Sequence, residues 1–178
     1  MSDAKPVIEI LFSESEIASR VATLAEEISV AAPRDLFVVI ILKGSFVFAA
    51  DLIRALERTG VEAQVDFMTL SSYGSATVSS GEVVLVRDIA EAVEGRDVLI
   101  VDDILESGRT LAFARNLVVE RGAASVKTCL LLDKAGKRTV PIEADFRGFE
   151  IGDRFVVGYG LDYAHHFRGL PYIGVLSR

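Results

Sequence analysis

The 178-residue sequence contains one cysteine and no apolar run long enough to cross a membrane. The single thiol, Cys129, excludes an intrachain disulfide, and its apolar neighbours predict a buried structural thiol. The longest purely apolar run, Leu36 to Leu42, has seven residues, whereas a membrane helix requires about 20. The N-terminus also lacks the basic start and apolar core of a secretory signal. We therefore expect a cytoplasmic protein with no membrane partner.

Basic residues are fewer than acidic ones: the sequence has 19 lysines and arginines and 26 aspartates and glutamates, which gives a formal net charge of -7. Proteins that bind the phosphates of nucleic acids usually present a basic face. The charge therefore argues against nucleic acid as the main partner. The only two histidines, His165 and His166, are neighbours whose side chains rarely point the same way, so they do not predict a metal site.

No linker, repeat or shift in composition divides the chain, so we expect one domain over residues 1–178. Ser13 and Glu16 form a capping box before an amphipathic pattern. The predicted helices are 14–31, 46–58 and 108–121, and the predicted strands are 37–42, 63–70, 83–87, 97–103 and 126–132. Alternating strands and helices with short connections favour an α/β fold, with a parallel sheet covered by helices on both faces.

The most informative motif joins the strand 97–103 to the next helix. Asp102 and Asp103 end the strand, where carboxylates can bind ribose hydroxyls or a divalent metal. The turn that follows consists of Glu106, Ser107, Gly108, Arg109 and Thr110. N–H groups at a helix start attract phosphate, and a glycine permits the dihedrals of an anion nest. A plain N-capped turn would account for Ser107 and Gly108, but not for three neighbouring carboxylates.

Other candidate residues end neighbouring strands, and each has a simpler alternative. Lys43, next to Gly44, can receive an anion at the same sheet edge or be a solvated lysine. Lys134 can donate to a carbonyl oxygen of a base or lie on the surface. Phe155 can stack on a planar ligand or belong to the core. The serine-rich segment 71–81 is either a mobile lid or an ordinary flexible connection.

Together these motifs resemble the type I phosphoribosyltransferases, and specifically the hypoxanthine-guanine phosphoribosyltransferases. The matching segments occur in order along nearly the whole chain: Leu-Lys-Gly at 42–44, Ser-Tyr at 72–73, the acidic motif at 99–111, Leu-Leu-Asp-Lys at 131–134 and the segment 145–163. The last of these is typical of the purine-specific branch. The resemblance implies a parallel-sheet core and a small hood, built from segments outside the core and mainly C-terminal, that covers the purine.

The resemblance also divides the matching residues between two substrates and a metal. Those implied for phosphoribosyl pyrophosphate (PRPP) or nucleotide are Lys43, Gly44, Ser72, Tyr73, Asp102, Asp103, Glu106, Ser107, Gly108, Arg109, Thr110 and Arg168. Those implied for the purine are Lys134, Phe155, Val156 and Asp162. Magnesium would be held by Asp102, Asp103 and Asp162.

The activity implied is purine salvage, in which phosphoribosyl passes from PRPP to hypoxanthine and guanine with release of pyrophosphate. One residue departs from the family pattern, because Glu106 stands where an aspartate usually acts as the base at purine N7. Glutamate keeps the carboxylate, but its extra methylene moves the group by on the order of 1 Å. The resemblance favours a homodimer or a homotetramer, and it leaves the preference among hypoxanthine, guanine and xanthine open.

A second hypothesis belongs to another class of protein. Some regulators that bind RNA share the phosphoribosyltransferase fold and use the acidic motif as a sensor of PRPP or nucleotide. They resemble this chain around 99–111 but not over 145–163. The acidic charge also disfavours this alternative.

Overall fold

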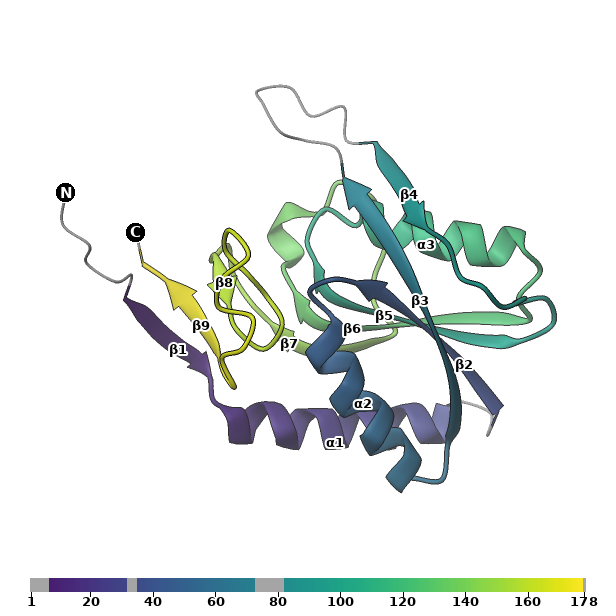
Figure 1. Cartoon of the computed structure of the whole chain (residues 1–178), viewed down its shortest axis with the longest axis horizontal. Coiled ribbons are helices and arrows are strands. Elements are labelled where there is room, and N and C mark those ends of the chain that lie inside the picture. The colour runs from purple at the N-terminus through teal and green to yellow at the C-terminus, as the bar shows by residue number, and fades with distance from the viewer. Residues whose placement is uncertain (1–6, 32–34, 73–81, 178) are drawn as a thin grey trace.

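A six-stranded sheet forms the centre of the protein (Figure 1). The structure, a computed structural model, describes residues 7–31, 35–72 and 82–177. The strand order is β4-β3-β2-β5-β6-β7, and all neighbours run parallel except β4, which is antiparallel to β3. The strands are β2 (Asp35–Leu42), β3 (Glu62–Ser72), β4 (Val83–Arg87), β5 (Asp97–Leu105), β6 (Ser125–Asp133) and β7 (Phe146–Glu150). The predicted α/β class is confirmed.

Helices cover both faces of this sheet, as the sequence predicts. The helices are α1 (Glu14–Ala31), α2 (Phe46–Arg58) and α3 (Arg109–Glu120), and a 3-10 turn, η1 (Ala135–Lys137), follows β6. In β2, Val38 and Ile40 pack toward α1 and α2, while Val39 and Ile41 pack toward α3. Successive residues of a strand face opposite sides of the sheet, so a strand that packs against helices on both sides is apolar at every position.

A second, three-stranded sheet joins the two ends of the chain beside the main sheet (Figure 1). Its strands are β1 (Ile8–Phe12), β8 (Val156–Val157) and β9 (Ile173–Leu176), in the order β1-β9-β8. Ile8 pairs with Leu176 in the antiparallel ladder. The residue pattern of the sequence does not predict these strands or β7, because short strands that pair with distant segments have only a weak alternation of apolar and polar residues.

The predicted capping box at the start of α1 is present. The Ser13 amide donates to Oε2 of Glu16 at 2.8 Å, and the Glu16 amide donates to Oγ of Ser13 at 3.4 Å. These two bonds satisfy N–H groups that the first turn of a helix leaves without partners. Cys129 is buried as predicted, and burial raises the pKa of its thiol, which keeps it protonated.

Replacement of Ser13 by alanine removes this cap and is expected to lower the free energy of unfolding by about 1 kcal/mol. The measurement is urea unfolding followed by circular dichroism. Ser13→Thr keeps an acceptor oxygen and serves as the matched control, with most of the stability retained. An equal loss in both variants would show that the cap is not what stabilises this helix start.

Candidate functional site

A cavity of about 580 Å³ opens at the carboxyl ends of the parallel strands. Segments that are far apart in the sequence meet there, because β2, β5 and β6 all end at this edge. The sequence-predicted residues that line the cavity are Lys43, Gly44, Asp103, Glu106, Lys134, Phe155, Val156, Asp162 and Arg168. The structure therefore brings residues of both implied groups, those for PRPP and those for the purine, to one cavity. Ser72, Asp102 and the turn residues Ser107, Gly108, Arg109 and Thr110 are not among the residues that line it.

Asp102, which is buried, and Asp103, which is half-buried, form an acidic pair near the carboxyl end of β5. The strand continues to Leu105, two residues beyond its predicted end. The Asp103 amide donates to Oδ1 of Asp102 at 2.8 Å. Burial raises the pKa of Asp102 well above its usual range, and the neighbouring charge of Asp103 raises it further. Burial also raises the pKa of Asp103, although Arg168 opposes the shift. Hydroxyl donors or a cation at this pair would therefore favour the charged carboxylates.

The pair lies against glycines that bring two other segments close. A side chain at Gly44 would overlap Oδ2 of Asp103, so only glycine allows the carboxylate to approach this backbone. Gly160 has φ at +99°, and a Cβ added there would overlap the carbonyl oxygen of Gly44. The peptide bond between Leu42 and Lys43 is cis. The loop after β2 is thus in direct contact with β5 and with the C-terminal segment.

The predicted phosphate turn begins at Glu106 and leads into α3. Gly108 has φ at +84°, a conformation that favours glycine, and α3 begins at the next residue. The Arg109 amide donates to Oγ of Ser107 at 3.3 Å. The first N–H groups of a helix have no acceptor within it, so those near Thr110 are suited to an anion.

Glu106 and Lys134 approach each other inside the cavity. Nζ of Lys134 lies 3.3 Å from Oε1 of Glu106 and 3.8 Å from Oδ1 of Asp153. Lys137 pairs with the same Asp153 at 2.8 Å. The side chain of Lys134 is only 9% exposed, so the surface-lysine alternative is wrong. Lys43, by contrast, lines the cavity and remains exposed.

The C-terminal segment supplies the apolar and ionic wall of the cavity. Phe155 is 45% exposed, so it is not a core residue, and its ring contacts Tyr163 edge-on with centroids 5.7 Å apart. Val156 is buried in β8. Asp162 pairs through Oδ1 with Arg168 at 2.7 Å and accepts the His165 amide at Oδ2.

Some predicted residues lie beside the cavity or outside the described part of the chain. Ser72 ends β3, and Tyr73 with most of the segment 71–81 falls in the undescribed range, so the structure does not address the lid. Ser71, in the candidate lid segment, lines the cavity. Several other lining residues were given no role from the sequence: Leu42, Thr69, Leu70, Val86, Ile104, Arg154 and Leu161. Arg154 directly precedes Phe155, and Leu161 directly precedes Asp162. This adjacency to predicted site residues is the one feature of the sequence that could have indicated them.

The described residues contain neither a protein-only metal cluster nor a membrane-spanning helix. No group of three or more histidine, cysteine, aspartate or glutamate side chains could hold a metal ion by itself there. In the same part of the chain, no helix is both long and apolar enough to span a membrane.

Comparison with known proteins identifies the class to which this fold and site belong. The family model for the phosphoribosyl transferase domain matches residues 8–164. The hypoxanthine-guanine phosphoribosyltransferase of Bacillus subtilis (strain 168) is 49% identical over 171 residues, which cover 95% of this chain and 93% of that protein. The chain therefore belongs to the phosphoribosyltransferase family, within its hypoxanthine-guanine branch.

Two further similarities are to a longer protein and to a solved structure. The bifunctional protein TilS/HprT of Listeria monocytogenes is 48% identical over 95% of this chain, which spans about a quarter of that protein, 26%. A solved HPRT structure in which an invariant aspartic acid is mutated to glutamic acid is 41% identical, with a TM-score of 0.88. That alignment covers 98% of this chain and 96% of the other.

Gly44→Ala is expected to destabilise the protein by about 1–3 kcal/mol, because the added methyl overlaps the Asp103 carboxylate. Asp103→Ala removes that overlap, so the double variant should recover part of the loss. Urea unfolding of the wild type, the two single variants and the double variant forms a cycle, with an expected coupling above about 0.5 kcal/mol. Additive effects would show that the two residues are not in contact.

Proposed function

We propose that this protein transfers the phosphoribosyl group of PRPP to hypoxanthine and guanine, giving the nucleoside monophosphates and pyrophosphate in purine salvage. The observation that carries the proposal is the 3.3 Å contact between Glu106, at the head of the phosphate turn, and Lys134, the implied partner of the base. Glu106 and Lys134 both line the cavity, so the proposed ribose-phosphate and base subsites would adjoin each other there. The RNA-binding alternative has no support from the relatives.

In the proposed complex, the turn from Glu106 to Thr110 binds the 5′-phosphate with its N–H groups and hydroxyls. Asp102 and Asp103 accept hydrogen bonds from the ribose hydroxyls, which offsets the cost of burying two carboxylates. Lys43, Gly44 and Arg168 contact the pyrophosphate. Ser72 and Tyr73 are assigned to the lid, by resemblance alone.

The base occupies the other half of the cavity. Phe155 stacks on the purine ring, and the backbone of Val156 contacts its edge. An ammonium carries three N–H donors, so Lys134 can donate to the 6-oxo oxygen and to Glu106 at once. Asp162 and Arg168 close this side of the cavity. Every 6-oxopurine satisfies Lys134, so discrimination among bases depends on position 2 of the ring.

Magnesium fits the donor set of this site. Mg²⁺ is usually held by one or two carboxylates together with substrate phosphates. The resemblance assigns Asp102, Asp103 and Asp162 to it, and of these Asp103 and Asp162 line the cavity. Burial raises the pKa values of both carboxyl groups of the acidic pair, and a cation bound beside them would favour their charged forms. When bound with PRPP, the metal neutralises charge on the leaving pyrophosphate.

The reaction forms a bond from purine N9 to C1′ of the ribose and breaks the C1′ bond to pyrophosphate. Positive charge develops on the ribose ring, and the buried carboxylates beside the hydroxyls stabilise it. Glu106 accepts the proton that leaves N7 of the base. The cavity would hold both reactants in line, which supplies the orientation that the reaction needs.

The organisation of the chain belongs to the same proposal. We assign residues 1–178 to one phosphoribosyltransferase domain, with the sheet β1-β9-β8 and the adjoining C-terminal loop as the hood over the purine. The expected homodimer or homotetramer rests on the family resemblance, and the proposed cytoplasmic location rests on the single cysteine.

The proposed activity is tested by incubating the purified chain with PRPP, Mg²⁺ and each of hypoxanthine, guanine and xanthine. Inosine and guanosine monophosphate should form, and initial rates at saturating PRPP rank the three bases. Omission of PRPP is the control. If neither hypoxanthine nor guanine gives a nucleotide, the proposal is wrong.

Glu106→Gln should lower kcat by about 10² to 10⁴, the usual contribution of a general base, with a much smaller change in the KM for PRPP. Glu106→Asp keeps the carboxylate and should stay within about tenfold of the wild-type kcat. The measurement is steady-state kinetics with hypoxanthine. Equal losses in kcat and in PRPP affinity would assign Glu106 to phosphate binding instead.

A further inference from the structure

The phosphate turn rests on residues 138–142, which follow η1 and which we call the supporting segment. The amides of Thr139 and Val140 both donate to the carbonyl oxygen of Ser107, at 2.9 and 3.0 Å. The Thr139 hydroxyl donates to the same oxygen at 3.2 Å. One carbonyl of the turn therefore receives three hydrogen bonds from the same side.

The supporting segment also packs against the glycine of the turn. A Cβ at Gly108 would lie 2.7 Å from Cγ2 of Ile142 and 3.2 Å from Cδ of Arg138. The supporting segment therefore fills the space on this side of Gly108. An anion would have to approach the turn from the opposite side.

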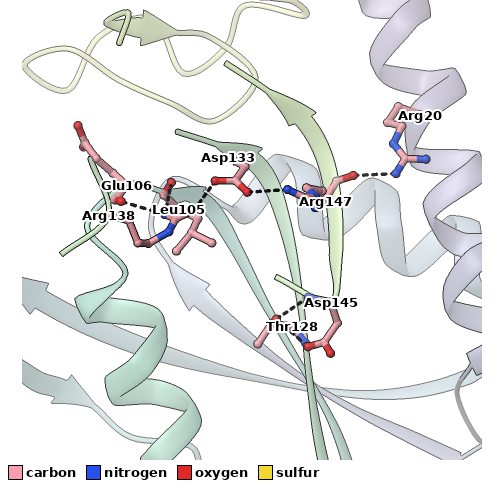
Figure 2. A network of polar contacts seen from close by, with 8 residues as sticks. All are labelled: Arg20, Leu105, Glu106, Thr128, Asp133, Arg138, Asp145 and Arg147. Atoms are coloured by element: carbon pink, nitrogen blue, oxygen red, sulfur yellow. Dashed lines mark hydrogen bonds and ion pairs between the residues drawn. The ribbon is translucent and has the colours of Figure 1, made fainter. Parts of the chain in front are cut away.

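Arg138 connects the supporting segment to the start of the turn (Figure 2). Its Nη1 donates to the carbonyl oxygens of Leu105 and Glu106, at 3.0 and 2.9 Å. Its Nη2 donates to the carboxylate of Asp133. A single planar guanidinium thus ties the end of β5 to the end of β6.

Asp133 anchors this guanidinium from within the protein. Its side chain is only 3% exposed, and a second guanidinium, that of Arg147, lies 3.3 Å from Oδ2. The carbonyl oxygen of Arg147 accepts a hydrogen bond from Arg20 of α1 at 2.7 Å (Figure 2). The network therefore extends from the phosphate turn through β6 and β7 to α1.

The pattern of these bonds sets the direction of the amides in the turn. In a trans peptide the C=O and the N–H point to opposite sides of the chain. The carbonyls of Leu105, Glu106 and Ser107 are all held by the supporting segment. The amides that share those three peptide planes, from Glu106 to Gly108, are consequently turned away from the segment as a group, which is the arrangement of an anion nest.

We propose that Arg138 is a positioning residue, which orients the amides of the turn for the 5′-phosphate without touching the substrate. The inference rests on the proposed function, because it takes this turn as the phosphate site. A lysine at position 138 keeps the positive charge but lacks the planar fork that reaches two carbonyls and a carboxylate together.

Arg138→Lys should raise the KM for PRPP about tenfold, since misdirected amides bind phosphate less well. It should raise the dissociation constant of ribose 5-phosphate, measured by calorimetry, by a similar factor. The KM for hypoxanthine and the kcat at saturating PRPP should stay within about threefold. A purely structural role for Arg138 would lower thermal stability and leave the ribose 5-phosphate affinity of the folded fraction unchanged, and that result would overturn the proposal.

Arg147→Lys is the matched control, because it alters the other guanidinium on Asp133 without contacting the turn. It should leave ribose 5-phosphate binding unchanged, and an equal weakening in both variants would also overturn the proposal. If Arg138→Lys does not fold, Thr139→Val tests the same support and should weaken ribose 5-phosphate binding by about two- to threefold. Inactive wild-type protein would contradict the proposed function, whereas active wild type with an unaffected Arg138→Lys would contradict only this inference.

Discussion

The parallel register of β2, β5 and β6 is the constraint on which the site depends. Ile40 pairs with Val101, and Val101 pairs with Cys129, so the three strands are aligned across the sheet. All three are apolar on both faces because helices cover both sides. A strand in this setting cannot slip by one residue without exchanging its two faces. The loops that follow therefore start at the same edge, and their polar residues meet in one cavity.

Charge and close packing then give this edge its chemistry. Burial disfavours ionisation of the Asp102–Asp103 pair, so ribose hydroxyls or a cation bound there would favour the charged carboxylates. On the other side, the phosphate turn faces outward because its carbonyls are held from behind by Arg138 and Thr139. The site is polar where the phosphoribosyl group would bind and apolar at Phe155, where the base would bind.

The sequence was sufficient to predict the parts of this arrangement that are local. The capping box at Ser13, the three helices and the glycine-containing turn after β5 follow from residue spacing, and the family resemblance marked residues as distant as Lys43 and Arg168. The pairing of β1 with β9 depends on partners at opposite ends of the chain, which no local pattern reveals. The ion pair of Glu106 with Lys134 and the bonds of Arg138 likewise depend on how separate loops fold together.

The central claim is that the ribose-phosphate and base subsites belong to one cavity and are filled together. A crystal structure with Mg²⁺, PRPP and an unreactive 6-oxopurine analogue tests it most directly. The account predicts the 5′-phosphate on the amides of the turn from Glu106 to Thr110, and the base against Phe155 with its 6-oxo oxygen at Lys134. A phosphate bound elsewhere, or a base outside this cavity while PRPP is bound, would contradict it.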